Sequence, residues 1–157
     1  MQSPRTDPPA PRDATAALGG VVDVRIETRK GGFVKAGGRA GPGFVSPLPC
    51  PFNYGSVPGT VAEDGEPIDA LVLGPRLTVG DVCRRSVLGI VSFQDAGQRD
   101  DKLVCGTGPE LASAASRLSI RAFFVVYAAA KLCLNLWRGR RGRTSFEGLR
   151  VFPGKAP

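Results

Sequence analysis

No histidine occurs among the 157 residues, and the chain holds one methionine, one tryptophan and two tyrosines. The lack of histidine removes the most common general base and most transition-metal sites. Proton transfer and ligand binding must then fall to carboxylates, lysine, arginine and tyrosine. The four cysteines, Cys50, Cys83, Cys105 and Cys133, form no CxxC pair. Their wide spacing argues against a zinc site and favours a reducing compartment, with the cysteines as buried small hydrophobes.

Long apolar runs are also missing, and none reaches the length needed to span a membrane. Residues 1–20 are rich in Pro, Ala and Asp and lack the basic start and apolar core of a secretory signal. We expect them to form a disordered leader. Residues 21–150 would form one domain and residues 151–157 a C-terminal tail. These features predict a cytoplasmic protein with no membrane partner.

Positive charge is in excess, with a formal net charge of +7, and much of it lies late in the chain. The late cluster consists of Arg138, Arg140, Arg141 and Arg143. A solvated face is the simplest interpretation. The alternatives are a field that steers an anionic substrate, a surface for an oligomer partner, and a nucleic-acid surface. Aromatic residues are few and not interleaved with the basic ones, so we expect no nucleic-acid partner.

Short segments with strand-like patterns dominate the chain. Strands are predicted at 21–28, 33–36, 44–46, 68–74, 82–93 and 102–105. The Pro- and Gly-rich stretch 47–60 should be mostly irregular, and one long helix is predicted over 109–136. Many short strands followed by one helix favour an α+β, mainly β fold. We expect a small, OB-like closed β-barrel with one long C-terminal helix packed against it.

A first acidic loop lies in the segment AEDGEPIDALVLGP, residues 62–75. It places Asp64, Glu66 and Asp69 beside an apolar run. Like charges repel one another, so this grouping predicts a positively charged ligand.

A second acidic loop, QDAGQRDDK at residues 94–102, supplies Asp95 and Asp100. Oxygen ligands without histidine or thiolate partners favour a hard cation such as Mg²⁺. The alternative is that Asp and Gly simply make good turns.

Together these motifs resemble the soluble family I inorganic pyrophosphatases. The segment CPFNYGSVPGTVAEDGEPIDALVLGP, residues 50–75, is similar to the family pattern NYGxxPxT followed by DGDPxD and an apolar strand. Residues 95–104, DAGQRDDKLV, resemble the family's second acidic loop, and residues 121–131, RAFFVVYAAAK, resemble its FFxxYK helix. Residues 24–36 fit the start, where a strand Glu and a phosphate-binding Lys occur. The resemblance covers residues 21–150.

The resemblance implies Mg²⁺-dependent hydrolysis of inorganic pyrophosphate to two phosphates by metal-activated water. It implies that Mg²⁺ is bound by Asp64, Asp69 and Asp100, with Asp95 lining the metal site and Glu27 supporting it. It implies that the phosphate groups are held by Lys35, Tyr54, Lys102 and Tyr127. Bacterial-type members form hexamers, so a homo-oligomer is also implied.

Three departures from the family pattern affect the site. The residue described as the general base is usually Asp, and here it is Glu66. The family's Lys after the helix Tyr is Ala128 here, and Lys131, one turn further on, is the candidate replacement. A phosphate-contacting Arg is missing, with Arg39 as the nearest substitute. The alternative function is therefore a catalytically weakened binding module whose basic tail contacts nucleic acid or protein.

Overall fold

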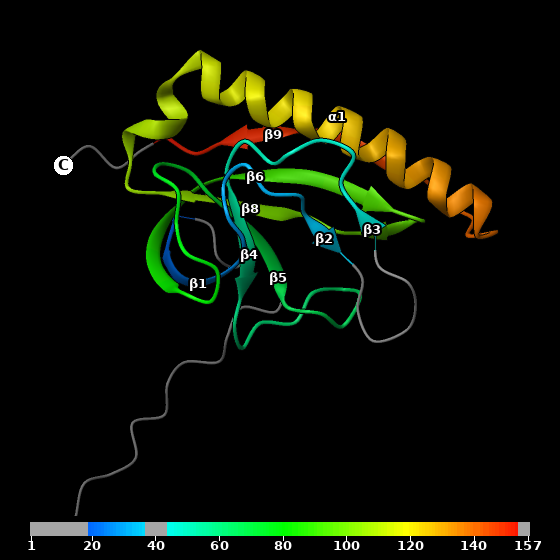
Figure 1. Ribbon diagram of the computed structural model, residues 1–157, viewed down its shortest axis with the longest axis horizontal. Coiled ribbons are helices and arrows are strands. Elements are labelled where there is room, and N and C mark those ends of the chain that lie inside the picture. Colours follow the sequence, from blue (N-terminus) through cyan, green and yellow to red (C-terminus); the bar gives the residue numbers. More distant parts are fainter. Residues whose placement is uncertain (1–18, 37–43, 154–157) are drawn as a thin grey trace, which may run out of the picture.

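The computed structural model describes residues 19–36 and 44–153, and Figure 1 shows its arrangement. One long helix lies along one side of the molecule, and the main sheet lies beneath it. Strand β9 (Ser145–Val151), which pairs with β6 (Val82–Asp95) in this sheet, lies next to the helix and packs against it. The Arg39 site and residues 1–18 of the expected leader fall outside the described residues.

The main sheet has seven strands, and a separate two-stranded sheet pairs β2 with β3. The strands are β1 (Val21–Thr28), β2 (Lys35–Ala36), β3 (Phe44–Val45), β4 (Asn53–Val57), β5 (Ile68–Val72), β6 (Val82–Asp95), β7 (Gln98–Arg99), β8 (Lys102–Gly106) and β9 (Ser145–Val151).

Five of these strands close into a hydrogen-bonded ring. The order is β1-β4-β5-β8-β6, and β1 also pairs antiparallel with β6. The β5–β8 pair is parallel, while the other pairs in the ring are antiparallel. This ring and the single long helix confirm the predicted mainly β fold, and the ring is compatible with an OB-like arrangement.

The prediction that residues 47–60 are irregular is wrong for β4, a fully buried strand between β1 and β5. Tertiary pairing on both sides outweighs the poor strand propensity of Gly55. The glycine is required, because a Cβ built there would lie 1.9 Å from the backbone oxygen of Arg25. Strand β1 can approach β4 this closely only because Gly55 has no side chain.

The predicted helix 109–136 consists of two pieces. A 3-10 helix, η2 (Pro109–Ala112), precedes α1 (Ala114–Trp137). Ser113 separates them with an extended backbone, φ −68° and ψ 130°. The inner face of α1 buries Phe123, Phe124 and Tyr127 in a core cluster beneath the helix. A second core cluster fills the ring itself.

Strand β9 was missed by the sequence analysis, which predicted no helix or strand after residue 136. It pairs antiparallel with β6 and lies beneath α1. The segment alternates poorly, and its Gly148 has a φ of +149° beside a register shift in the β6–β9 pairing. Pairing with the long strand β6 and packing against α1 therefore determine this strand more than its own pattern does.

The structure changes the expectations for the burial of the cysteines and for the apolar length of the helix. Cys50 and Cys105 are buried as predicted, but Cys133 is exposed on α1. Burial raises the pKa of both buried thiols to about 12.

By length and composition alone, α1 could cross a membrane, whereas the sequence analysis expected no apolar run of that length. A core helix of a soluble protein meets the same criteria, and the inner face of α1 lies in the core.

Candidate active site

Three neighbouring strands bring Asp69, Tyr54 and Lys102 together. They lie on β5, β4 and β8, and β5 pairs with both of the other strands. The Tyr54 hydroxyl donates to Oδ2 of Asp69 at 2.7 Å, and Lys102 Nζ donates to the same oxygen at 2.8 Å. Oδ1 of Asp69 accepts no hydrogen bond from the residues that the structure describes. The Asp69 carboxylate is thus fixed in orientation and keeps one oxygen available.

Lys102 joins the two acidic loops. Its ammonium is buried and also donates to Oδ1 of Asp100 at 2.6 Å. Burial alone would lower the pKa of Lys102, but the carboxylates of Asp100 and Asp69 raise it above its usual value. Burial, and then the nearby Asp69 charge, raises the pKa of Asp100 despite the opposing lysine charges. Two like charges are therefore held close together by one shared cation.

Asp95, at the end of β6, is held by two residues of α1. Lys131 Nζ lies 2.6 Å from Oδ2 of Asp95, and Asn135 Nδ2 donates to Oδ1 at 2.7 Å. Burial opposes ionisation, but the lysine and asparagine bonds hold the pKa of Asp95 below its usual range. Lys131 Nζ also lies 3.9 Å from Oδ2 of Asp100. Lys131, the candidate replacement for the lysine that the family has at Ala128, therefore reaches the acidic cluster.

Tyr127 projects from α1 into the same region, with Lys131 Nζ 5.7 Å from its ring centroid. Its hydroxyl is buried and has no hydrogen-bond partner among the described residues. Burial raises the pKa of this tyrosine above its usual value, so the hydroxyl keeps its proton. A buried, unsatisfied hydroxyl is costly and rare in folded proteins. Tyr127 is therefore a donor suited to a ligand with acceptor oxygens.

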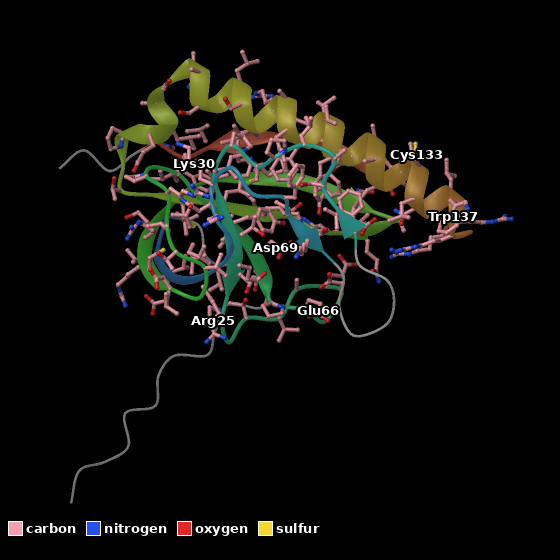
Figure 2. The ribbon with its side chains drawn as sticks, viewed as in Figure 1. Arg25, Lys30, Glu66, Asp69, Cys133 and Trp137 are labelled. Carbon is pink, nitrogen blue, oxygen red and sulfur yellow. The ribbon has the colours of Figure 1, made fainter. Side chains whose placement is uncertain are left out.

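The first acidic loop is open by contrast. Asp64 and Glu66 are exposed, and Oδ1 of Asp64 accepts the backbone N–H of Glu66 at 3.0 Å. Gly65 between them has a φ of +85°, so this is a tight turn of the kind that Asp and Gly favour. Figure 2 shows Asp69 within the fold and Glu66 out on the loop. The structure does not bring Asp64 or Glu66 into contact with the Asp69–Asp100 cluster.

Glu27 and Lys35, which the resemblance assigned to the site, are both exposed. Glu27 Oε1 accepts the Ser56 hydroxyl at 2.6 Å, which links β1 to β4. Lys35 lies on the short strand β2, directly before residues outside the described part. Neither residue contacts the Asp69–Asp100 cluster in the described part of the chain.

The acidic residues do not form a preassembled metal site. Within residues 19–36 and 44–153, no three His, Cys, Asp or Glu side chains are grouped closely enough to hold a metal ion. The donor chemistry of Asp69 and Asp100 nevertheless suits a hard divalent cation, because both offer carboxylate oxygens. A third carboxylate, such as Asp64, would have to approach from the open loop.

The sequence analysis missed Asn135 and Thr144. Asn135 is buried, and its Nδ2 donates to Asp95 and to the Thr144 hydroxyl at 2.9 Å. The Thr144 hydroxyl in turn accepts the backbone N–H of Ala96 at 2.9 Å. A single asparagine inside an apolar helix segment, LCLNLW, was the signal that could have marked Asn135 as a polar residue in need of a partner.

In comparison with known proteins, the chain is similar to inorganic pyrophosphatases. A family model described as "Inorganic pyrophosphatase" matches residues 39–131, more than half of the chain. An inorganic pyrophosphatase of Gluconobacter oxydans is 41% identical over 63 residues, which cover 40% of this chain and 36% of that protein. A soluble inorganic pyrophosphatase of Oryza sativa is 43% identical over 70 residues, covering 43% of this chain and 33% of that protein. These matches span about a third of each relative's length.

Structural comparison indicates the fold of solved inorganic pyrophosphatases. The crystal structure of inorganic pyrophosphatase from Thermus thermophilus superposes with a TM-score of 0.60 and 24% identity. The match covers 94% of this chain and 88% of that one. Because the family model matches more than half of the sequence, the chain belongs to the inorganic pyrophosphatase family.

Proposed function

We propose that the protein hydrolyses inorganic pyrophosphate to two phosphates and uses Mg²⁺ as its cofactor. The observation that carries the proposal is the buried, unpartnered hydroxyl of Tyr127 beside a cluster of fixed carboxylates and lysines. A donor without a partner, next to ammonium groups, suits a small, highly anionic ligand. Pyrophosphate, with its many acceptor oxygens, is such a ligand.

The carboxylates are proposed to hold the cation. Asp69 and Asp100 are fixed by Lys102, and Asp64 would join them from the open loop. When bound, Mg²⁺ would neutralise substrate oxygens and acidify the attacking water. Asp95 would line this region, held by Lys131 and Asn135. Glu27, bonded by Ser56, would support the site from β1.

The reaction forms one bond from the water oxygen to phosphorus and breaks the bond from that phosphorus to the bridging oxygen. We propose that Glu66 accepts the water proton, because it occupies the position of the family's general base and its exposed carboxylate makes no ion pair with any described residue. The bridging oxygen leaves with the second phosphate and takes up a proton. Lys35, Tyr127 and Lys131 would donate to the phosphate oxygens and stabilise the charge that develops there.

Tyr54 and Lys102 are proposed to act through Asp69 as well. Tyr54 is buried, and its hydroxyl already donates to that carboxylate. Lys102 uses two hydrogen bonds on Asp69 and Asp100. We therefore assign both residues chiefly to positioning the carboxylates, although the family resemblance implies that they contact phosphate.

The loop that follows α1 is proposed to attract the anionic substrate. Arg140 Nη1 donates to Oδ1 of Asn135 at 3.3 Å, and the backbone oxygen of Arg143 accepts the N–H of Gly97. These bonds tie the basic loop to the elements that carry Asp95. A positive loop beside the site would raise the local substrate concentration.

The alternative of a binding module is not favoured by the similar proteins, which are named as pyrophosphatases. We also propose that the protein acts in the cytoplasm, in keeping with four free cysteines.

The test is phosphate release by wild type and Tyr127→Phe from pyrophosphate, tripolyphosphate and a nucleoside triphosphate. Wild type should act mainly on pyrophosphate. The variant should lose about 10²- to 10³-fold in kcat/KM, as expected for one lost donor at a charged transition state. Its stability should change little, because the hydroxyl has no partner to lose. No phosphate release by wild type from any of the three would contradict the proposal.

A further inference from the structure

The connection between α1 and β9, residues 138–144, folds back against the turn that follows β6. The backbone N–H of Gly97 in this turn donates to the backbone oxygen of Arg143 at 2.8 Å. The N–H of Ala96 donates to the Thr144 hydroxyl at 2.9 Å, across 48 positions of sequence. Two segments that are distant in the chain are thus joined by hydrogen bonds.

The close approach of these two segments requires Gly142. A Cβ built there would lie 2.6 Å from the carbonyl carbon and oxygen of Ala96, closer than a real side chain comes. Its φ of +110° also favours glycine over other residues. The connection is therefore held tightly against the turn, and Thr144 has a fixed place beside it.

Asn135 links this connection to Asp95. Only 3% of Asn135 is exposed, and its Nδ2 donates to Asp95 Oδ1 at 2.7 Å and to the Thr144 hydroxyl at 2.9 Å. Its Oδ1 accepts Nη1 of Arg140 at 3.3 Å. An amide oxygen must face a donor and an amide nitrogen must face acceptors. These three partners therefore favour one orientation of the Asn135 amide, with its N–H groups toward Asp95 and Thr144.

Asp95, held in this way, offers its second oxygen to Lys131. Lys131 Nζ lies 2.6 Å from Oδ2 of Asp95, and the lysine side chain is 12% exposed. Lys131 is the candidate replacement for the lysine that the family pattern has at Ala128. A lysine has a flexible stem, so an ammonium that comes from a different turn of the helix needs partners that hold it in position. The family model ends at residue 131, so Asn135 and Thr144 lie beyond the matched segment.

We propose that Asn135 and Thr144 are positioning residues for pyrophosphate hydrolysis, which hold Asp95 so that the Lys131 ammonium stays in the site. The inference rests on the proposed function, in which Lys131 donates to the phosphate oxygens. Asn135 and Thr144 need no contact with the substrate, because both act through Asp95. The segment after residue 131 thereby compensates for the lysine that is missing at Ala128.

The first test compares Thr144→Val, which removes the hydroxyl at nearly the same volume, with Thr144→Ser, which keeps it. Thr144→Val should lower kcat/KM for pyrophosphate about 10-fold, because small displacements of a catalytic group already cost rate. Thr144→Ser should stay close to wild type. Asn135→Asp, which turns a carboxylate oxygen toward Asp95 in place of a donor, should lose at least as much as Thr144→Val.

The same substitution in a Lys131→Met background separates positioning from a general effect on the fold. If Thr144 acts through Lys131, Thr144→Val should cause no further loss of kcat/KM once the ammonium is gone. It should still lower the midpoint of urea denaturation, because the buried network is broken in both backgrounds. A loss of kcat/KM that is as large with Lys131→Met as without it would overturn the proposal.

The second test needs no activity, metal or substrate. The folded proteins are treated with N-hydroxysuccinimide acetate, and the rate of acetylation of each lysine is followed by peptide mass spectrometry. Lys131 should react severalfold faster in Thr144→Val than in wild type or Thr144→Ser. Lys30 is exposed and gives the reference rate, whereas Lys102 is buried and should stay unreactive. An unchanged rate at Lys131, or an equal rise at Lys102, would overturn the proposal.

The two tests distinguish a failure of this inference from a failure of the proposed function. A wild type that is active on pyrophosphate, together with a fully active Thr144→Val and an inactive Lys131→Met, would overturn the inference alone. A wild type that releases no phosphate would overturn the proposed function and the role in hydrolysis that rests on it. The acetylation rates would then still decide whether the network holds Lys131.

Discussion

The carboxylates of the candidate site fall into two groups that differ in what surrounds them. Asp69, Asp95 and Asp100 are partly or largely buried, and each forms an ion pair with Lys102 or Lys131. Asp64 and Glu66 lie on an exposed loop and make no ion pair among the described residues. The first group is arranged by the fold itself. The second group can join a ligand only by moving or by the ligand bridging to it.

Because their surroundings differ, the two groups of carboxylates are expected to have different roles. Carboxylates that are held by lysines keep one geometry without a ligand, so they can define where a cation binds. Carboxylates on an open turn contribute little to stability and can change position at small cost. We therefore expect substitutions in the first group to affect folding and activity together, and substitutions in the second to affect activity alone.

The largest effect is expected for Asp69→Asn, which removes the charge that Tyr54 and Lys102 orient. Pyrophosphate hydrolysis should fall by on the order of 10²–10³-fold, because the charge at the centre of the site is lost. Steady-state phosphate release measures the loss. An unchanged kcat would show that Asp69 serves only the fold.

Lys102→Met tests whether the first group depends on its shared cation. The ammonium is buried, and its removal takes from Asp69 and Asp100 the cation that they share. The free energy of unfolding should fall by about 3–5 kcal/mol, as for other broken buried pairs. Urea denaturation measures it. Adding Asp100→Asn should recover part of the loss, and a double variant as unstable as the sum of the singles would argue against the pairing.

Glu66→Gln tests the second group. Activity should fall by about 100-fold if this carboxylate is the general base, while the free energy of unfolding should change by no more than about 0.5 kcal/mol at this exposed position. Glu66→Asp is the matched control that keeps the charge. It shifts the carboxylate by about 1.5 Å, enough to alter the rate, since about 1 Å can matter 100-fold. Equal activity of Glu66→Gln and wild type would exclude this base.

The smallest effect is expected for Glu110, which lies outside the site. Its carboxylate is held by neutral donors only. Burial opposes its ionisation, but bonds from Thr107 and Gly108 hold the pKa of this carboxyl below its usual range. Because the folded pKa is the lower one, the stabilisation is present above the unfolded pKa of about 4.3. It is lost as pH falls through the folded pKa. Because water screens these exposed bonds, Glu110→Gln should cost only about 0.3 kcal/mol at neutral pH and progressively less in acid, measured by urea denaturation at several pH values.

The parts of the molecule that were predicted from the sequence are those with strong local patterns. Strand β1 has the predicted bounds, and β5, β6 and β8 lie where Val-, Leu- and Ile-rich runs indicated. Helical spacing made Lys131 a candidate for the site, and its ammonium lies beside Asp95. The β4 strand was not predicted, because its strand conformation depends on pairing with β1 and β5 and on the close approach at Gly55.

The site was predictable as a set of residues but not as a geometry. The family resemblance assigned Asp64, Asp69 and Asp100 to one metal site, and the structure joins the last two through Lys102. Asp64 instead caps its own turn, a local interaction that competes with the site. Asn135 and Thr144 act through contacts distant in sequence, so no local pattern could place them beside Asp95.

The most direct test of the account is phosphate release from pyrophosphate by the wild-type protein, with Mg²⁺ and after its removal by EDTA. The account predicts release that depends on Mg²⁺ and returns when Mg²⁺ is added back in excess of the chelator. Release that continues unchanged in EDTA would contradict the role proposed for the carboxylates. No release in either condition would contradict the proposed function itself.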